Sequence, residues 1–105
     1  MNLFKGEKRK ITIEYVDEYK KPIDVSSYTF ELIGKVSRDQ QESVFKLDDT
    51  CFDKTNANTG TIILNFDTAS IESNYYICQV AAVSSDTTIY SPIFNMEILE
   101  SLCTV

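Results

Sequence analysis

The chain has 105 residues, of which 43% are hydrophobic and 25% charged, a composition typical of one globular domain with a single core. Its net charge of −6 argues against a nucleic-acid partner, because phosphates require a basic face. The sequence contains no histidine, so His-based catalytic triads and acid–base pairs are excluded. No apolar run approaches the ~20 residues of a membrane span, and no signal-peptide pattern follows the basic start. We therefore expect a protein that is made in a cytoplasm and has no membrane partner.

The first nine residues combine apolar and basic side chains. Leu3 and Phe4 precede Lys8 and Arg9. Two interpretations remain open: residues 1–9 form an N-terminal arm that orders only on a partner, or they are a frayed terminus. The first interpretation makes these four residues interface candidates.

Alternation of apolar and polar residues begins at residue 10 and predicts strands over 10–16 and 28–33. The polar turn between them contains Tyr19, Lys20 and Lys21. An aromatic residue beside two lysines in an exposed turn suits a protein interface, so these three are also interface candidates. Gly34 indicates a strand end or a bulge, and a short strand is predicted over residues 43–47.

Residues 48–60 read as a long polar loop. Its carboxylates, Asp48, Asp49 and Asp53, are weak calcium candidates, because calcium takes six to eight oxygen ligands. Their spacing matches no EF-hand, and Lys54 lies among them. A solvated loop without a metal accounts for the same residues, so we expect no cofactor.

The second half of the chain predicts further strands over residues 61–66, 75–83, 87–90 and 93–99. Residues 67–74 have the only helical character, one turn at most, with Asp67 as an N-cap candidate. Residues 75–83 are apolar on both faces, which indicates a central strand. About seven short strands favour an all-β, two-sheet antiparallel sandwich, with an open barrel as the alternative. We expect a single domain over residues 1–105 with a short tail at 100–105.

The three cysteines, Cys51, Cys78 and Cys103, are widely spaced and contain no CxxC pair. An odd count without such pairs predicts reduced thiols rather than a disulfide framework or a zinc site. No histidine is present to activate a thiol, and the three glycines are too scattered for a phosphate-binding loop. We therefore do not expect an enzyme.

Charge is distributed unevenly along the sequence. The first 46 residues contain nine basic and eight acidic side chains, a sum of +1, whereas the remaining 59 contain one and eight, a sum of −7. Complementary patches of this kind help copies to associate head to tail. Chance on a solvated surface explains the asymmetry equally well.

Several motifs resemble those of a known family. Lys5-Gly6-Glu7 followed by an alternating strand, and then Pro22-Ile23-Asp24-Val25-Ser26 before a second strand, is similar to the opening of short bacteriophage virion proteins and of the N-terminal domains of phage baseplate-type proteins. Residues 60–64, 73–80 and 91–98 resemble later strands of the same family. This chain departs from the pattern by lacking a glycine before Tyr75 and an acidic residue after Tyr76.

The resemblance implies an immunoglobulin-like sandwich that is a non-enzymatic building block of a virion, in the tail, neck or baseplate. Its implied partners are other copies of itself, in a symmetric homo-oligomer, and larger phage tail, neck or head proteins. A capsid-decorating protein is a variant of this hypothesis. The alternative is a carbohydrate- or host-receptor-binding module that uses Tyr19 or Tyr90 and the loop at residues 48–60.

Overall fold

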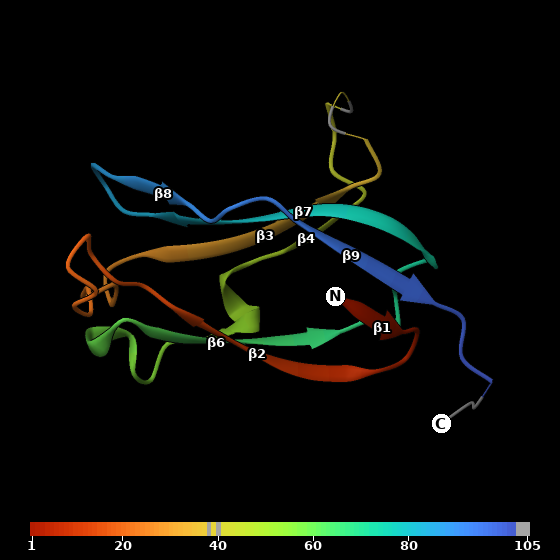
Figure 1. The fold of residues 1–105 in the computed structure, drawn as a ribbon, viewed down its shortest axis with the longest axis horizontal. Helices are drawn as coiled ribbons and strands as arrows, with labels where there is room; N and C mark the ends of the chain where they lie inside the picture. Colours follow the sequence, from red (N-terminus) through yellow and green to blue (C-terminus); the bar gives the residue numbers. More distant parts are fainter. Residues whose placement is uncertain (38, 40, 103–105) are drawn as a thin grey trace.

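The computed structural model describes residues 1–37, 39 and 41–102. Two β-sheets pack face to face (Figure 1), which confirms the predicted all-β sandwich. The elements in chain order are the strands β1 (Asn2–Phe4), β2 (Lys8–Glu14), β3 (Thr29–Lys35) and β4 (Phe45–Leu47), the 3-10 turn η1 (Asp49–Cys51), β5 (Phe52–Asp53), the 3-10 turn η2 (Ala57–Thr59), and the strands β6 (Thr61–Asp67), β7 (Asn74–Val83), β8 (Thr88–Tyr90) and β9 (Phe94–Leu99). No helix in the described part of the chain is long and apolar enough to cross a membrane.

The strand order is that of an immunoglobulin-like domain. The larger sheet has the order β1-β9-β7-β3-β4, with β8 paired to β7, and the smaller sheet has the order β2-β6-β5. Across the smaller sheet, β2, β6 and β5 match the B, E and D positions of such a domain, and the larger sheet contains the C, F and G positions. The predicted antiparallel pairing is correct for every named strand pair except β1 and β9, which are parallel.

The core lies between the sheets and is built from alternate residues of each strand. Its largest fully buried side chains include Tyr76, Phe30, Phe66, Leu32 and Ile62. The ring of Phe45 contacts Tyr76 edge-to-face, with the ring centroids 5.0 Å apart. The same ring covers Gly34, where an added Cβ would lie 2.3 Å from it. Gly34 is the penultimate residue of β3, one residue from the predicted strand end, and its missing side chain makes room for Phe45.

The start of β7 has the geometry of a tyrosine corner. The Tyr76 hydroxyl donates a 2.5 Å hydrogen bond to the carbonyl oxygen of Glu72, as immunoglobulin-like domains do where the chain turns into this strand. Two residues later, Cys78 occupies the position of the second cysteine in those domains. Here it is a free, buried thiol, and Cys51 is also free. Cys103 lies outside the described residues.

The N-terminal residues form neither a free arm nor a frayed terminus, so both interpretations of residues 1–9 are wrong. Asn2 to Phe4 form β1 on the edge of β9, and the Leu3 side chain is fully buried in the core. The buried Thr68 hydroxyl donates to the Phe4 carbonyl at 2.7 Å and accepts the Glu7 N–H at 2.9 Å. The turn between β1 and β2 is thus anchored from the interior.

Two further segments differ in detail from the prediction. Residues 68–73 form turns and bends without a helix, although Asp67 does accept the Ala69 N–H at 2.9 Å as an N-cap would. The loop over residues 48–60 contains β5, because the buried Phe52 pairs with Leu64 of β6.

Candidate protein-interaction face

The larger sheet carries apolar residues on the face that points away from the core. We call this surface the outer face and define it by Ile33, Ile77, Gln79, Ala81, Val83, Tyr90 and Ile93. In the strand register, Ile33 lies opposite Gln79, and Ala81 lies opposite Tyr90. Two open hollows of about 330 and 250 Å³ lie side by side on the outer face and share Ile33 and Gln79 as walls.

Apolar and polar side chains alternate across the outer face. In the strand register Ile33 lies between Lys46 and Gln79, and Ile77 lies opposite Lys35. Ile33, Ile77 and Ala81 are half-buried by their neighbours, whereas Tyr90 and Ile93 are 65% and 46% exposed. On the same face Glu31 and Lys46 form an ion pair at 3.1 Å. Apolar side chains interleaved with polar ones are common in protein interfaces.

The apolar pattern of residues 75–83 accounts for part of this surface. Apolar residues on both faces of residues 75–83 correctly indicated a central strand, since β7 pairs with β3 and β9. The smaller sheet covers one face of β7. In the edge-on view of Figure 1, no helix or strand in the described part of the chain lies over the other face. The additional apolar side chains are therefore left at the surface.

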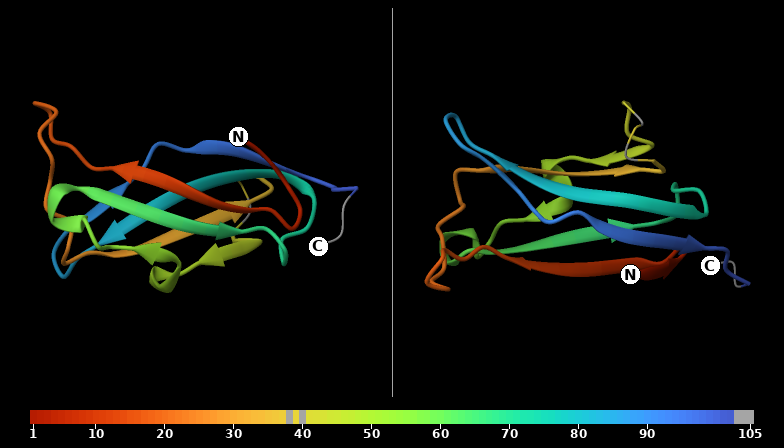
Figure 2. Two further views of the ribbon diagram at one scale, coloured as in Figure 1. Left: turned by 90° about the horizontal axis from the view of Figure 1, so that it is seen from below. Right: turned by 45° about the horizontal axis from the view of Figure 1, so that its top comes forward.

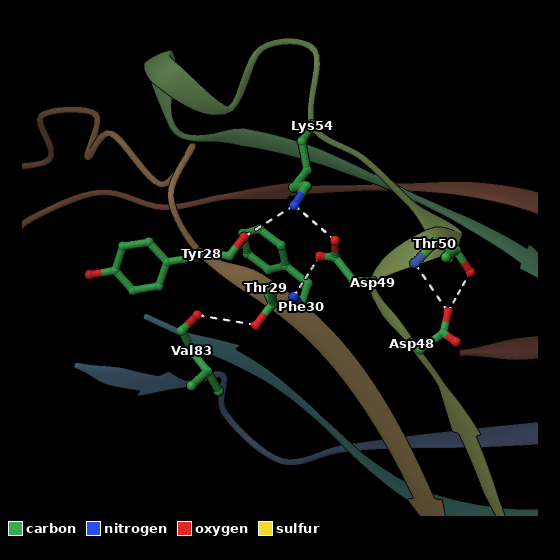
Figure 3. A network of polar contacts seen from close by, with 8 residues as sticks. All are labelled: Tyr28, Thr29, Phe30, Asp48, Asp49, Thr50, Lys54 and Val83. Carbon is green, nitrogen blue, oxygen red and sulfur yellow. Dashed lines mark hydrogen bonds and ion pairs between the residues drawn. The ribbon is translucent and has the colours of Figure 1, made fainter. Parts of the chain in front are cut away.

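Figure 3 shows the surroundings of two predicted calcium candidates, Asp48 and Asp49. Asp49 is already paired: its Oδ1 accepts the Phe30 N–H and its Oδ2 accepts a hydrogen bond from Lys54 Nζ, both at 2.8 Å. Lys54 Nζ also donates to the Tyr28 carbonyl at 3.3 Å. Partial burial acts to raise the pKa of Asp49, but the hydrogen bonds from Lys54 and Phe30 outweigh it and lower that pKa. The hydrogen bonds of Asp49 and Lys54 to the Phe30 and Tyr28 backbone tie the loop to the start of β3.

Asp48 and Asp53 stabilise turns. Asp48 accepts the Thr50 N–H at 3.0 Å, and Asp53 accepts the Thr55 N–H at 2.9 Å. The hydrogen bonds from Thr55 lower the pKa of Asp53. Among the described residues, no three cysteine or acidic side chains come close enough together to hold a metal ion. The structure therefore does not bring the three calcium candidates together.

The predicted interface residues do not form one surface. Phe4, Lys8 and Arg9 are exposed near one end of the sandwich, whereas the turn with Tyr19, Lys20 and Lys21 lies at the opposite end (Figure 1). Tyr19 is 75% exposed, as expected for a contact residue. Leu3 is a core residue, so its assignment as an interface candidate is wrong.

The comparisons with known proteins bear on the fold alone. No family model and no curated protein matches the chain. Among solved structures, the chain is similar to an endo-beta-1,4-mannanase from Thermotoga petrophila, with a TM-score of 0.59 and 6% sequence identity. The match covers 95% of this chain and 18% of the mannanase chain. The fold is an immunoglobulin-like β-sandwich. At 6% identity, the similarity to the mannanase concerns the fold and not the substrate.

Proposed function

We propose that this chain is a non-enzymatic structural protein of a bacteriophage virion, located in the tail, neck or baseplate and acting through protein–protein contacts. The observation that carries the proposal is the group of apolar side chains, among them Ile77, Tyr90 and Ile93, on the uncovered outer face. Apolar side chains that gather on one exposed face often mark an interaction site. The class of assembly comes from the sequence motifs that resemble phage virion proteins, such as Lys5-Gly6-Glu7.

The chemistry of the described side chains is consistent with this proposal. Burial raises the pKa of the Cys78 thiol to about 11, so that it is not a nucleophile near neutral pH. The acidic residues with lowered pKa values all accept hydrogen bonds within the fold: Glu7, Asp24, Asp49 and Asp53.

The proposal is tested with particles of the phage whose genome encodes this chain. We expect mass spectrometry to detect the chain in purified particles. We expect Ile77→Glu to reduce its incorporation strongly, because a carboxylate would replace an apolar contact of the outer face. Asn58→Glu is the matched control, since Asn58 is exposed within η2. Absence of the wild-type chain from purified particles would contradict the proposal, and so would normal incorporation of folded Ile77→Glu.

A second candidate function rests on two exposed tyrosines of the larger sheet. Tyr75 and Tyr90 are 61% and 65% exposed, and flat exposed aromatic rings can stack on sugar rings or on a host receptor. This function predicts glycan-array binding that is lost in Tyr90→Ala. If Tyr90→Ala retains incorporation into particles and no glycan binds, the assembly function is the one that stands. A capsid-decorating role would appear as incorporation into heads rather than tails.

A further inference from the structure

Strand β2 is a long edge strand with one open side. It pairs with β6 through all seven of its residues, and no other strand in the described part of the chain pairs with it. The left panel of Figure 2 shows β2, coloured red to orange, at the border of the smaller sheet with β6 on one side only. In an immunoglobulin constant-type domain this border position is filled by strand A. Here β1 lies on β9 of the other sheet instead.

An apolar opening lies beside this edge. It has a volume of about 360 Å³ and is lined mostly by apolar side chains, among them Ile11, Ile13, Leu64, Val80 and Phe94. Ile11 and Ile13 belong to β2 itself and are half-buried. A strand added to β2 would provide hydrogen-bond partners for its outer edge and would also cover part of this opening.

The charges of β2 favour one particular occupant, which is β2 of a second copy. The strand reads Lys8-Arg9-Lys10-Ile11-Thr12-Ile13-Glu14, basic at its start and acidic at its end. Residues that lie opposite each other in a sheet share a face, so that an antiparallel pair centred on Ile11 places Lys8 opposite Glu14 of the second copy. Both side chains are exposed, and neither forms an ion pair in the described part of the chain.

The same charges disfavour other additions. Lysines on an edge strand normally prevent unwanted pairing, and parallel addition of a second β2 would place like charges side by side. In the antiparallel arrangement Lys8 would lie between Glu14 of the second copy and Asp67, which is opposite it on β6. The basic residues therefore select a two-fold pairing rather than block it.

We propose that two copies of this chain pair through β2 in antiparallel register about a two-fold axis at Ile11. The two smaller sheets then form one continuous sheet of order β5-β6-β2-β2-β6-β5. This interface is distinct from the outer face, and the inference does not depend on the virion assignment.

Analytical ultracentrifugation with a charge-reversal cycle tests the pairing. The wild type is expected to form dimers. Glu14→Lys places like charges opposite each other twice per dimer and is expected to weaken the dimer about tenfold. The double variant Lys8→Glu with Glu14→Lys restores opposite charges across the interface. It is expected to recover part of the affinity, because the new carboxylate at position 8 also lies opposite Asp67 of β6. Glu18→Lys, in the exposed turn that follows Asp17, is the control for net charge and should leave the dimer unchanged.

Each outcome of the cycle is decisive. A wild type that stays monomeric at every concentration reached overturns the inference. So does a dimer that Glu14→Lys leaves intact, or one that the double variant does not recover. If Ile77→Glu abolishes the dimer and Glu14→Lys leaves it intact, the contact lies on the outer face. That result overturns the β2 pairing but not the proposed function.

Discussion

The Tyr76 hydroxyl and the Glu72 carbonyl oxygen lie 2.5 Å apart and tie the start of β7 to the segment that crosses from the smaller sheet to the larger one. Tyr76 is 1% exposed, so that this polar group is removed from bulk water and has its partner within the fold. Tyr76→Phe removes only the hydroxyl. We expect it to lower the free energy of unfolding by about 1–2 kcal/mol in urea titrations.

Tyr15 provides the matched control. Its hydroxyl is buried and has no hydrogen-bond partner in the described part of the chain, and burial raises the pKa of this phenol. Removing an unsatisfied buried hydroxyl is neutral or stabilising, so Tyr15→Phe should not lower stability. An equal loss in Tyr15→Phe and Tyr76→Phe would contradict the specific role of the Tyr76 hydrogen bond.

Gly60 follows η2 with a φ of 80°, and a Cβ there would lie 2.5 Å from the Tyr15 carbonyl oxygen. Gly60→Ala should therefore destabilise the fold through both a left-handed backbone and a backbone clash, by roughly 2 kcal/mol or more. Gly6 is the control, because its φ is 91° but nothing lies within 4 Å of an added Cβ. Thermal unfolding that ranks Gly6→Ala as the more damaging change would refute this account.

The Asp49–Lys54 ion pair predicts a pH-dependent stability. Because the pKa of Asp49 is lowered in the folded chain, its contribution is fully present above the ordinary aspartate pKa of about 3.9 and is lost as the pH falls through the lowered value. Asp49→Asn should therefore cost about 1 kcal/mol near neutral pH, and the difference from the wild type should shrink in acid. Urea titrations across this pH range measure it, and a difference that is constant with pH would exclude the ion pair as its cause.

Calcium should leave the melting temperature unchanged. Both carboxylate oxygens of Asp49 accept hydrogen bonds, and one of them is held by the Lys54 ammonium group. A cation would have to displace that charge. Differential scanning fluorimetry with calcium and with chelator gives the comparison, and a rise in melting temperature with calcium that Asp49→Asn removes would show that the loop does bind the ion.

Cys78 should resist thiol reagents in the native protein. It is 1% exposed, and burial raises its pKa to about 11, so that little thiolate is present and reagents cannot reach it. Its labelling at pH 8, followed by mass spectrometry of its peptide, should occur at the rate of unfolding. Labelling that is as fast in buffer as in urea would contradict the burial of Cys78.

The positions of the strands could be predicted from the sequence because side-chain alternation is a local property. Ile11 and Ile13, or Tyr76 and Cys78, face the same way wherever the strand is placed. The apolar character of residues 75–83 on both faces also correctly placed β7 in the middle of its sheet. These inferences need no knowledge of distant neighbours.

Pairing between distant segments was decided by the tertiary structure alone. Leu3 became a core residue because the first strand found the edge of β9, and Gly34 gained its role because the ring of Phe45 lies over it. Asp49 accepts the Phe30 N–H because the fold brings the start of β3 against the loop. Which apolar face stays uncovered, and which strand edge stays open, depends on the order of strands across the sheets. Alternation along one strand determines which side chains share a face, but it carries no information about what lies against that face.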